Sequence, residues 1–123
     1  MAIEYAIITD DSTPTTLLTV PAGKEYAITT IIVCNTTLFD PANPTDGTAY
    51  FDMHLVPQSD DPAGDTIPPL ETQVIKDLYL EAGETFTFDS EKLVLGAEDK
   101  IVFVGYAVAS GGSLSATVSY LEM

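Results

Sequence analysis

The chain lacks most of the residues that perform catalysis, bind metals through nitrogen or sulfur, or bind phosphate. Its 123 residues include no Arg, no Trp, one His (His54) and one Cys (Cys34), and 19 acidic residues against four Lys give a net charge of −15. A domain this acidic repels DNA, RNA and anionic lipid, and the Lys residues form no basic cluster. We therefore expect no nucleic-acid partner, no membrane partner and no enzymatic activity.

Signals for disulfides, secretion and membrane insertion are also missing. One Cys cannot form an internal disulfide, and Cys34 ends the apolar run Ile31–Cys34, where a small buried side chain is expected rather than a reactive thiol. Met1–Glu4 shows no basic segment leading into an apolar stretch, so we expect no classical signal peptide. No apolar run approaches the ~18–20 residues of a membrane-spanning helix. We expect a soluble protein made in the cytoplasm.

Apolar residues, in contrast, are abundant. They form 46% of the chain, far more than a disordered acidic tail would contain, and the length suits one domain over residues 1–123. Pro and Gly recur at short intervals, with β-branched and aromatic residues between them. This pattern predicts an all-β fold, an antiparallel two-sheet sandwich of the jelly-roll or Greek-key kind.

About nine short strands are expected, separated by turn sequences such as Pro21–Gly23, Glu81–Gly83 and Gly96–Asp99. The expected strands are Ile3–Thr9, Thr15–Val20, Glu25–Asn35, Thr48–Val56, Thr72–Leu80, Glu84–Phe88, Glu91–Leu95, Lys100–Val108 and Ser113–Glu122.

Two of these strands alternate between apolar and polar residues, as strands over a single core do. In Thr48–Val56 the expected inward residues are Ala49, Phe51, Met53 and Leu55. In the last strand they are Leu114, Ala116, Val118 and Tyr120. Asp52 and His54 should then face outward.

Two other strands, Glu25–Asn35 and Lys100–Val108, are apolar on both faces. A single core cannot absorb both faces, so either loops or another subunit must cover the surplus. We expect a partner subunit, because the available loops are polar. The interface candidates on these strands are Ile31, Val33, Val102, Val104 and Tyr106.

Two long segments rich in Pro and Asp, Leu38–Asp46 and Pro57–Pro69, flank one expected strand. We expect them to project from one end or edge of the sandwich, and long ordered loops often carry function. Phe39 and Ile67 are their apolar interface candidates.

Side chains that could support chemistry are few. Asp60, Asp61 and Asp65 cluster as Ca²⁺ ligands sometimes do, but the EF-hand pattern is absent and such clusters arise by chance among 19 acidic residues. His54 has no Gly-x-Ser-x-Gly nucleophile motif to serve, so we expect a surface or interface histidine. We expect no catalytic residue, no metal and no cofactor.

Four segments carry a resemblance: Leu18–Lys24, Ile31–Asn35, Leu80–Phe86 and Leu93–Ile101. Their order and their turn-and-strand pattern resemble small β-sandwich virion proteins of tailed bacteriophages, although Glu98 stands where such proteins usually have Gly. The matching segments form turns and strands and include no catalytic motif. The resemblance implies a structural subunit of the particle and assigns no binding residues.

Together, these observations lead us to expect a structural subunit of a phage virion, first of all a capsid decoration protein. It would act through contacts with other virion proteins, the major capsid protein or neck and tail subunits, and with further copies of itself. The alternatives are a neck, tail or fibre accessory, or a sugar- or calcium-dependent binding module that uses the Pro57–Pro69 loop.

Overall fold

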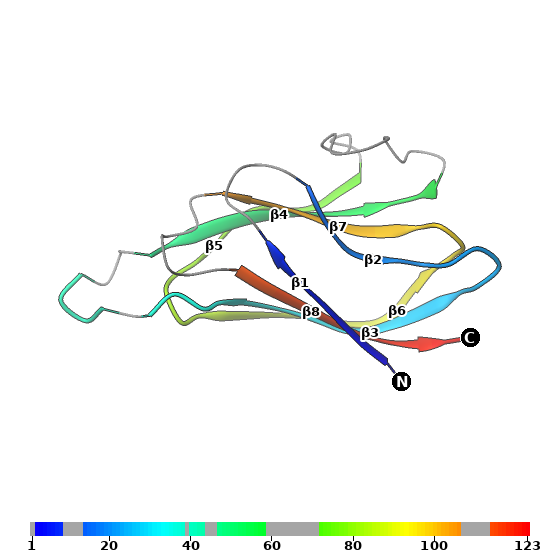
Figure 1. Cartoon of the computed structure of the whole chain (residues 1–123), viewed down its shortest axis with the longest axis horizontal. Helices are drawn as coiled ribbons and strands as arrows, with labels where there is room; N and C mark the ends of the chain where they lie inside the picture. The colour runs from blue at the N-terminus through cyan, green and yellow to red at the C-terminus, as the bar shows by residue number, and fades with distance from the viewer. Residues whose placement is uncertain (1, 9–13, 39, 44–46, 59–71, 107–113) are drawn as a thin grey trace.

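In the described part of the chain, eight strands form two antiparallel four-stranded sheets that pack face to face (Figure 1). The computed structural model describes residues 2–8, 14–38, 40–43, 47–58, 72–106 and 114–123, without the side chains of residues 90–92. The strands are β1 (Ala2–Ile8), β2 (Thr15–Thr19), β3 (Tyr26–Asn35), β4 (Ala49–Val56), β5 (Gln73–Leu80), β6 (Thr85–Leu95), β7 (Lys100–Tyr106) and β8 (Leu114–Glu122).

The order of the strands identifies the fold. One sheet runs β1-β8-β3-β6 and the other β2-β7-β4-β5. The first strand therefore pairs with the last, the second with the seventh, the third with the sixth and the fourth with the fifth. This is a jelly roll, in which one long hairpin of paired strands folds over to form the two sheets. The all-β two-sheet sandwich predicted from the sequence is confirmed, and no helix in the described ranges is long and apolar enough to cross a membrane.

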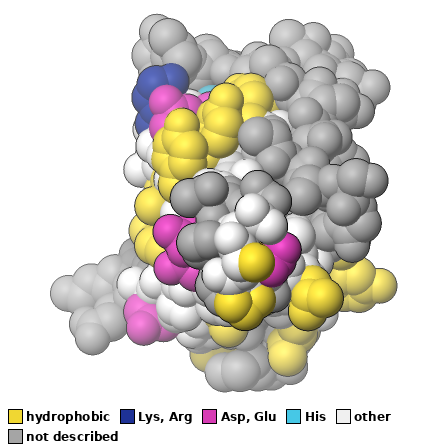
Figure 2. Space-filling model, turned by 90° about the vertical axis from the view of Figure 1, so that its left-hand side faces the viewer, with side chains coloured by type: hydrophobic (Ala, Val, Ile, Leu, Met, Phe, Trp, Pro, Cys, Tyr) yellow, Lys and Arg dark blue, Asp and Glu magenta, His cyan; other side chains and the backbone are white. Residues whose placement is uncertain are grey.

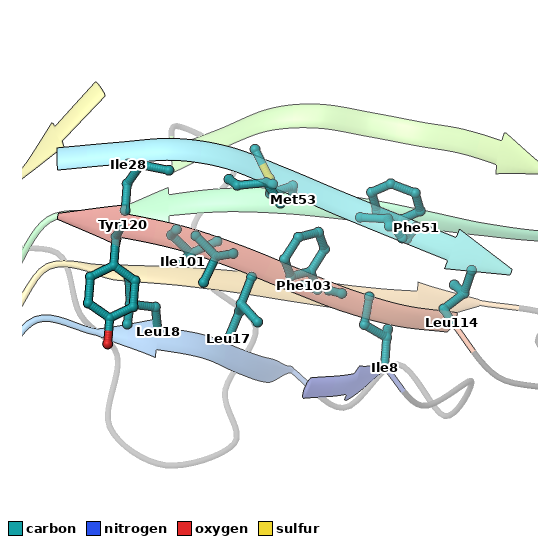
Figure 3. Packing of buried hydrophobic residues seen from close by; sticks show 14 of the residues in the cluster. Ile8, Leu17, Leu18, Ile28, Phe51, Met53, Ile101, Phe103, Leu114 and Tyr120 are labelled. Atoms are coloured by element: carbon teal, nitrogen blue, oxygen red, sulfur yellow. The ribbon is translucent and has the colours of Figure 1, made fainter. Parts of the chain in front are cut away.

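The core lies between the sheets, where alternate residues of each strand meet (Figure 3). Phe51, Phe103, Ile101 and Leu114 are fully buried there. Phe51 packs at ring-centroid distances of 5.7 Å from Phe103 and 6.4 Å from Phe86. The inward residues predicted for Thr48–Val56 and for the last strand all belong to this core or pack against it.

A β-bulge in β3 decides which of its side chains reach the core. The register of β3 against β8 jumps from Ile28–Tyr120 to Thr30–Ser119, so one extra residue of β3 is accommodated and the alternation changes phase. Tyr26 and Ile28 before the bulge, and Ile31 and Val33 after it, consequently all face the core. An unbroken strand, as expected from the sequence, would place Tyr26 and Ile28 on one face and Ile31 and Val33 on the other.

One expected boundary also differs. Glu84–Phe88 and Glu91–Leu95 were predicted as separate strands, whereas β6 is continuous over Thr85–Leu95. Its register against β3 passes from Asp89 directly to Leu93. The interruption in the sequence pattern therefore marks an irregular stretch within a strand and not a turn.

Three turns have the same backbone design. Lys24, Glu84 and Asp99 each donate a backbone N–H to the carbonyl three residues earlier, at 3.0–3.2 Å. The third residue of each turn has positive φ: Gly23 at 78°, Gly83 at 82° and Glu98 at 65°. A type II turn requires positive φ at this position, which favours glycine.

Asn35 ties the end of β3 to both neighbouring loops. Its side-chain amide, which is fully buried, donates to the carbonyls of Gly47 (2.7 Å) and Leu80 (3.0 Å). Its Oδ1 accepts from the backbone N–H of Thr37 at 3.1 Å. The side chain thus satisfies three backbone groups where the two sheets meet.

Candidate interaction surfaces

The described side chains on the outer face of the β1-β8-β3-β6 sheet carry little charge. The register of the four strands brings the outward side chains into rows such as Tyr5, Thr117, Ile32 and Thr87. We call this surface the low-charge face. Its described members are Ile3, Tyr5, Ile7, Ala27, Thr29, Thr30, Ile32, Cys34, Thr85, Thr87, Asp89, Val94, Ser115, Thr117, Ser119 and Leu121.

Asp89 is the single charged side chain among those members, in a chain of net charge −15. The other side chains are hydroxyls and apolar groups, and Ile32, Val94 and Leu121 are 39%, 46% and 42% exposed. Interface centres are depleted in charged residues and enriched in apolar ones. The low-charge face therefore has the composition of a contact surface.

Strand β1 forms one edge of this face and is exposed over most of its length. Ile3 is 69% exposed, Tyr5 72% and Ile7 48%. β1 was correctly predicted as a strand, but none of these residues was predicted as an interface candidate. Their alternation with Ala2, Glu4 and Ala6 was the available signal, because the larger apolar side chains occupy the outward positions.

The outer face of the other sheet carries a row of three stacked tyrosines. Tyr50 on β4 lies 4.8 Å from Tyr79 on β5 and 4.9 Å from Tyr106 on β7, measured between ring centroids. Tyr79 is 61% exposed.

The end of the sandwich seen in Figure 2 shows hydrophobic and acidic side chains next to one another.

Asp52 lies beside this tyrosine row and is almost fully buried. Its Oδ1 accepts from the backbone N–H of Asp77 at 2.7 Å, and its Oδ2 lies 3.5 Å from the hydroxyl of Tyr106. Burial and the charge of Asp52 raise the pKa of Tyr106. Asp77 itself has φ of 50° at an irregularity of the edge strand β5, and this bend directs its N–H to Asp52.

His54 follows on the same outward side of β4, yet it is only 1% exposed. Its Nδ1 lies 2.9 Å from the hydroxyl of Thr72, while Nε2 is buried without a hydrogen-bond partner. Burial lowers the pKa of His54, and the nearby Asp52 carboxylate opposes this shift. His54, expected at the surface or at an interface, is thus buried within the single chain, and burial favours its neutral form.

The predicted interface residues occupy several different environments. Ile31 and Val33 lie in the core, and Val102 and Val104 are 4% and 0% exposed, so none of these four side chains is on the surface of the single chain. Tyr106 is half-buried in the tyrosine row. Phe39 and Ile67 lie outside the described residues.

The two long loops are described only in part. The described part of Leu38–Asp46 projects from one end of the sandwich, as expected (Figure 1), and Leu38 is 90% exposed. Most of Pro57–Pro69, with Asp60, Asp61 and Asp65, lies outside the described residues. Within the described part of the chain, no group of three His, Cys, Asp or Glu side chains is placed to hold a metal ion.

A small pocket opens where β4 ends beside β6. It is lined by Leu55, Val56, Pro57, Leu93, Leu95 and Asp99. The two carboxylate oxygens of Asp99 accept backbone N–H groups from Gln58 (3.0 Å) and Gly96 (2.8 Å). The polar atoms of this pocket therefore hold the loops together.

No family model, no curated protein and no solved structure was found to match this chain. The resemblance to phage virion proteins accordingly stays a prediction, and the class that the structure defines is an all-β jelly-roll protein. Jelly rolls occur in viral capsid proteins, lectins and other families, so the fold alone does not decide the function.

Proposed function

We propose that this chain is a structural subunit of a phage virion, a capsid decoration protein that binds other virion proteins and performs no catalysis. The observation that carries this proposal is the low-charge face. A protein of net charge −15 must keep most of its surface in water, yet the described members of one sheet face offer hydroxyl and apolar groups with a single carboxylate, Asp89.

Physical considerations support a contact role for this face. A flat, nearly uncharged surface can be covered without desolvating carboxylates, whose burial is costly when they are unpaired. Apolar area removed from water contributes roughly 25 cal/mol per Å². Many identical copies on one particle would convert a modest contact into firm attachment. The acidic remainder of the surface would then form a soluble exterior.

The location of the protein is tested by mass spectrometry and immunogold labelling of purified particles of the phage that encodes it. Stoichiometric presence with label over the head is the expected result. Label confined to the neck, tail or fibres would replace decoration by an accessory role. Absence of the chain from the particles would overturn the proposal.

The low-charge face is tested by a matched pair of substitutions. Thr117 lies in the middle of the face, opposite Tyr5 and Ile32, whereas Thr16 is exposed on β2 of the other sheet. Thr117→Asp should prevent incorporation into particles, and Thr16→Asp should not. Equal incorporation of both variants, at equal melting temperatures, would exclude this face as the attachment surface.

A carbohydrate-binding module is the second candidate, and the tyrosine row Tyr79–Tyr50–Tyr106 favours it. Exposed aromatic rings stack on the apolar faces of sugars while nearby polar groups orient them, and Asp52 and Asp77 lie beside the row. A glycan array decides this: a sugar signal lost in Tyr79→Ala but kept in Tyr5→Ala, the matched exposed tyrosine of the other sheet, would support this module.

A further inference from the structure

We propose that β1 is a self-association site, where two copies of this chain pair their β1 strands antiparallel about a two-fold axis at Tyr5. The pairing would join two four-stranded sheets into one continuous eight-stranded sheet. This inference goes beyond the virion role and does not depend on it, because it concerns the isolated chain.

The edges of the two sheets are formed by the four strands β1, β6, β2 and β5. Three of these strands have interrupted registers against their neighbours: β2 between Thr16 and Leu18, β6 between Asp89 and Leu93, and β5 at two points. Bulges and irregularities of this kind hinder edge-to-edge pairing. β1 pairs with β8 over seven consecutive residues without a shift, so it is the one regular edge among the described strands.

The composition of β1 also favours pairing with another strand. Its sequence, Ala-Ile-Glu-Tyr-Ala-Ile-Ile, contains no Pro, no Lys and one charge, Glu4. Residues Ala2–Tyr5 are exposed although they belong to a strand. Natural proteins usually guard an open edge with Lys, Pro or a bulge, and a long apolar edge without these features is a template for strand addition.

In one register, β1 is complementary to itself. With Tyr5 opposite Tyr5 of the second copy, Ile3 opposes Ile7 and Glu4 opposes Ala6, so all seven residues find partners. Ile3, Tyr5 and Ile7 then form a ladder of apolar cross-strand pairs on the outer side, the side of the low-charge face.

The neighbouring registers that keep the two outer faces on one side are worse. A two-fold axis at Glu4 places two carboxylates directly opposite each other, which destabilises a strand pair. An axis at Ala6 leaves Ala2 and Ile3 without partners and sets Glu4 against Ile8, which is buried in the core. Charge and burial therefore both select Tyr5.

The occupant is a second copy because the fit is between the strand and itself. Two paired edge strands bury less than the roughly 800 Å² per partner of a typical stable complex, so we expect micromolar affinity. On an assembled particle, the high local concentration of subunits would complete the pairing.

The test is sedimentation equilibrium of the full chain at high micromolar concentration, with three variants. The wild type is expected to be dimeric. Tyr5→Lys should raise the dissociation constant at least tenfold, whereas Tyr79→Lys, which alters the comparably exposed tyrosine of β5, should not change it. Mixing Tyr5→Lys with Tyr5→Glu should restore a dimer, because opposite charges then meet at the axis. Circular dichroism of each variant verifies the fold.

Cross-linking tests the register directly. In a Cys34→Ser background, Tyr5→Cys should form an intermolecular disulfide on mild oxidation, because the residue meets its own copy at the axis. Ile3→Cys should link poorly, since Ile3 faces Ile7. A monomeric wild type, or a dimer insensitive to Tyr5→Lys, would overturn the proposal and leave the β1 edge to a strand of another protein. Equal linking at both positions would overturn the register.

Discussion

Glu98 has a backbone conformation that residues other than glycine rarely adopt, with φ of 65°. Left-handed φ costs an L-residue roughly 1 kcal/mol, and the two sister turns use Gly23 and Gly83 at this position. Glu98→Gly is therefore expected to raise the free energy of unfolding by about 0.5–1 kcal/mol, after the greater entropy of Gly in the unfolded chain is counted. Urea unfolding measures this value.

The control for Glu98 is the residue before it. Ala97 is not among the residues with positive φ, so Ala97→Gly relieves no strain and should lower stability by up to about 1 kcal/mol. If both glycine variants shift stability in the same direction, strain at Glu98 is not the cause.

Substitution of Asn35 should destabilise the fold strongly, because its side chain is buried and bonds three backbone groups. Asn35→Ala removes the partner of three backbone groups, and unpaired buried groups cost about 1–3 kcal/mol each, partly offset by water entry. We expect a loss of about 2–4 kcal/mol in thermal or urea unfolding. Asn43→Ala, which removes an exposed contact with Asp40, should cost less than about 0.5 kcal/mol. A loss at Asn35 as small as that at Asn43 would contradict this account.

His54 couples folding to pH. Its folded-state pKa lies below the ordinary value of 6.5, so the unfolded chain binds the proton more readily. The stability that neutral His54 contributes is complete above 6.5 and is lost as the pH falls from 6.5 toward the folded-state pKa. His54→Asn keeps a polar atom near Thr72 but has no proton to gain, so it should not show this loss.

The measurement compares unfolding free energies of wild type and His54→Asn at about pH 7.5 and about pH 5.5. The advantage of the wild type over the variant should shrink at the lower pH. Comparing the two proteins cancels the change in unfolding free energy that both show when protonation of carboxylates reduces their net negative charge. An advantage that is unchanged or larger at low pH would contradict the assignment.

At the level of single elements, the bulge of β3 contains one surplus residue, and this leads to a deletion experiment. Removing Thr29 leaves Ile28 and Ile31 on the core side, because Thr30 alone then separates them. Removing Ile32 instead moves Val33 and Asn35 to the wrong face, since a one-residue slip inverts a strand. We expect the Thr29 deletion to fold with a loss below about 2 kcal/mol, and the Ile32 deletion to remain unfolded by circular dichroism. A folded Ile32 deletion would show that the bulge can migrate.

The same element shows what sequence could and could not predict. Strand positions followed from alternation and turn residues, and seven of the eight strands lie within two residues of an expected one. The bulge has no marker in Ile28–Ile31, so the faces of β3 were assigned incorrectly. The burial of His54 also escaped prediction, because alternation tells which side of a strand a residue occupies and not what covers that side.

The candidate surfaces could be identified only once the topology of the sheets was known. Nothing in Ala2–Ile8 reveals that this strand lies at an edge while the last strand lies inside the sheet. Only the register turned scattered Ser, Thr and Ile residues of four strands into one low-charge face. Interface candidates were predicted from apolar excess within single strands, which selected Ile31 and Val33, although both lie in the core.

For the whole molecule, net charge governs how copies meet. Two chains of −15 repel each other at long range, and salt screens this repulsion beyond about 10 Å at 0.1 M. If β1 pairs with itself through uncharged side chains, added NaCl should strengthen dimerisation. Sedimentation across a salt series measures this effect. Association that weakens with salt would indicate contacts between opposite charges instead.

The position of β8 in its sheet affects how the protein folds during its synthesis. β8 lies between β1 and β3, and Ala2 is aligned with Tyr120. Until β8 has left the ribosome, β1 has no neighbour in its sheet and the core lacks the inward side chains of β8. Such distant pairings make folding slow, and they delay it until Glu122 has emerged. The β1-β8-β3-β6 sheet, and any contact through its outer face, can therefore form only after β8 has been synthesised.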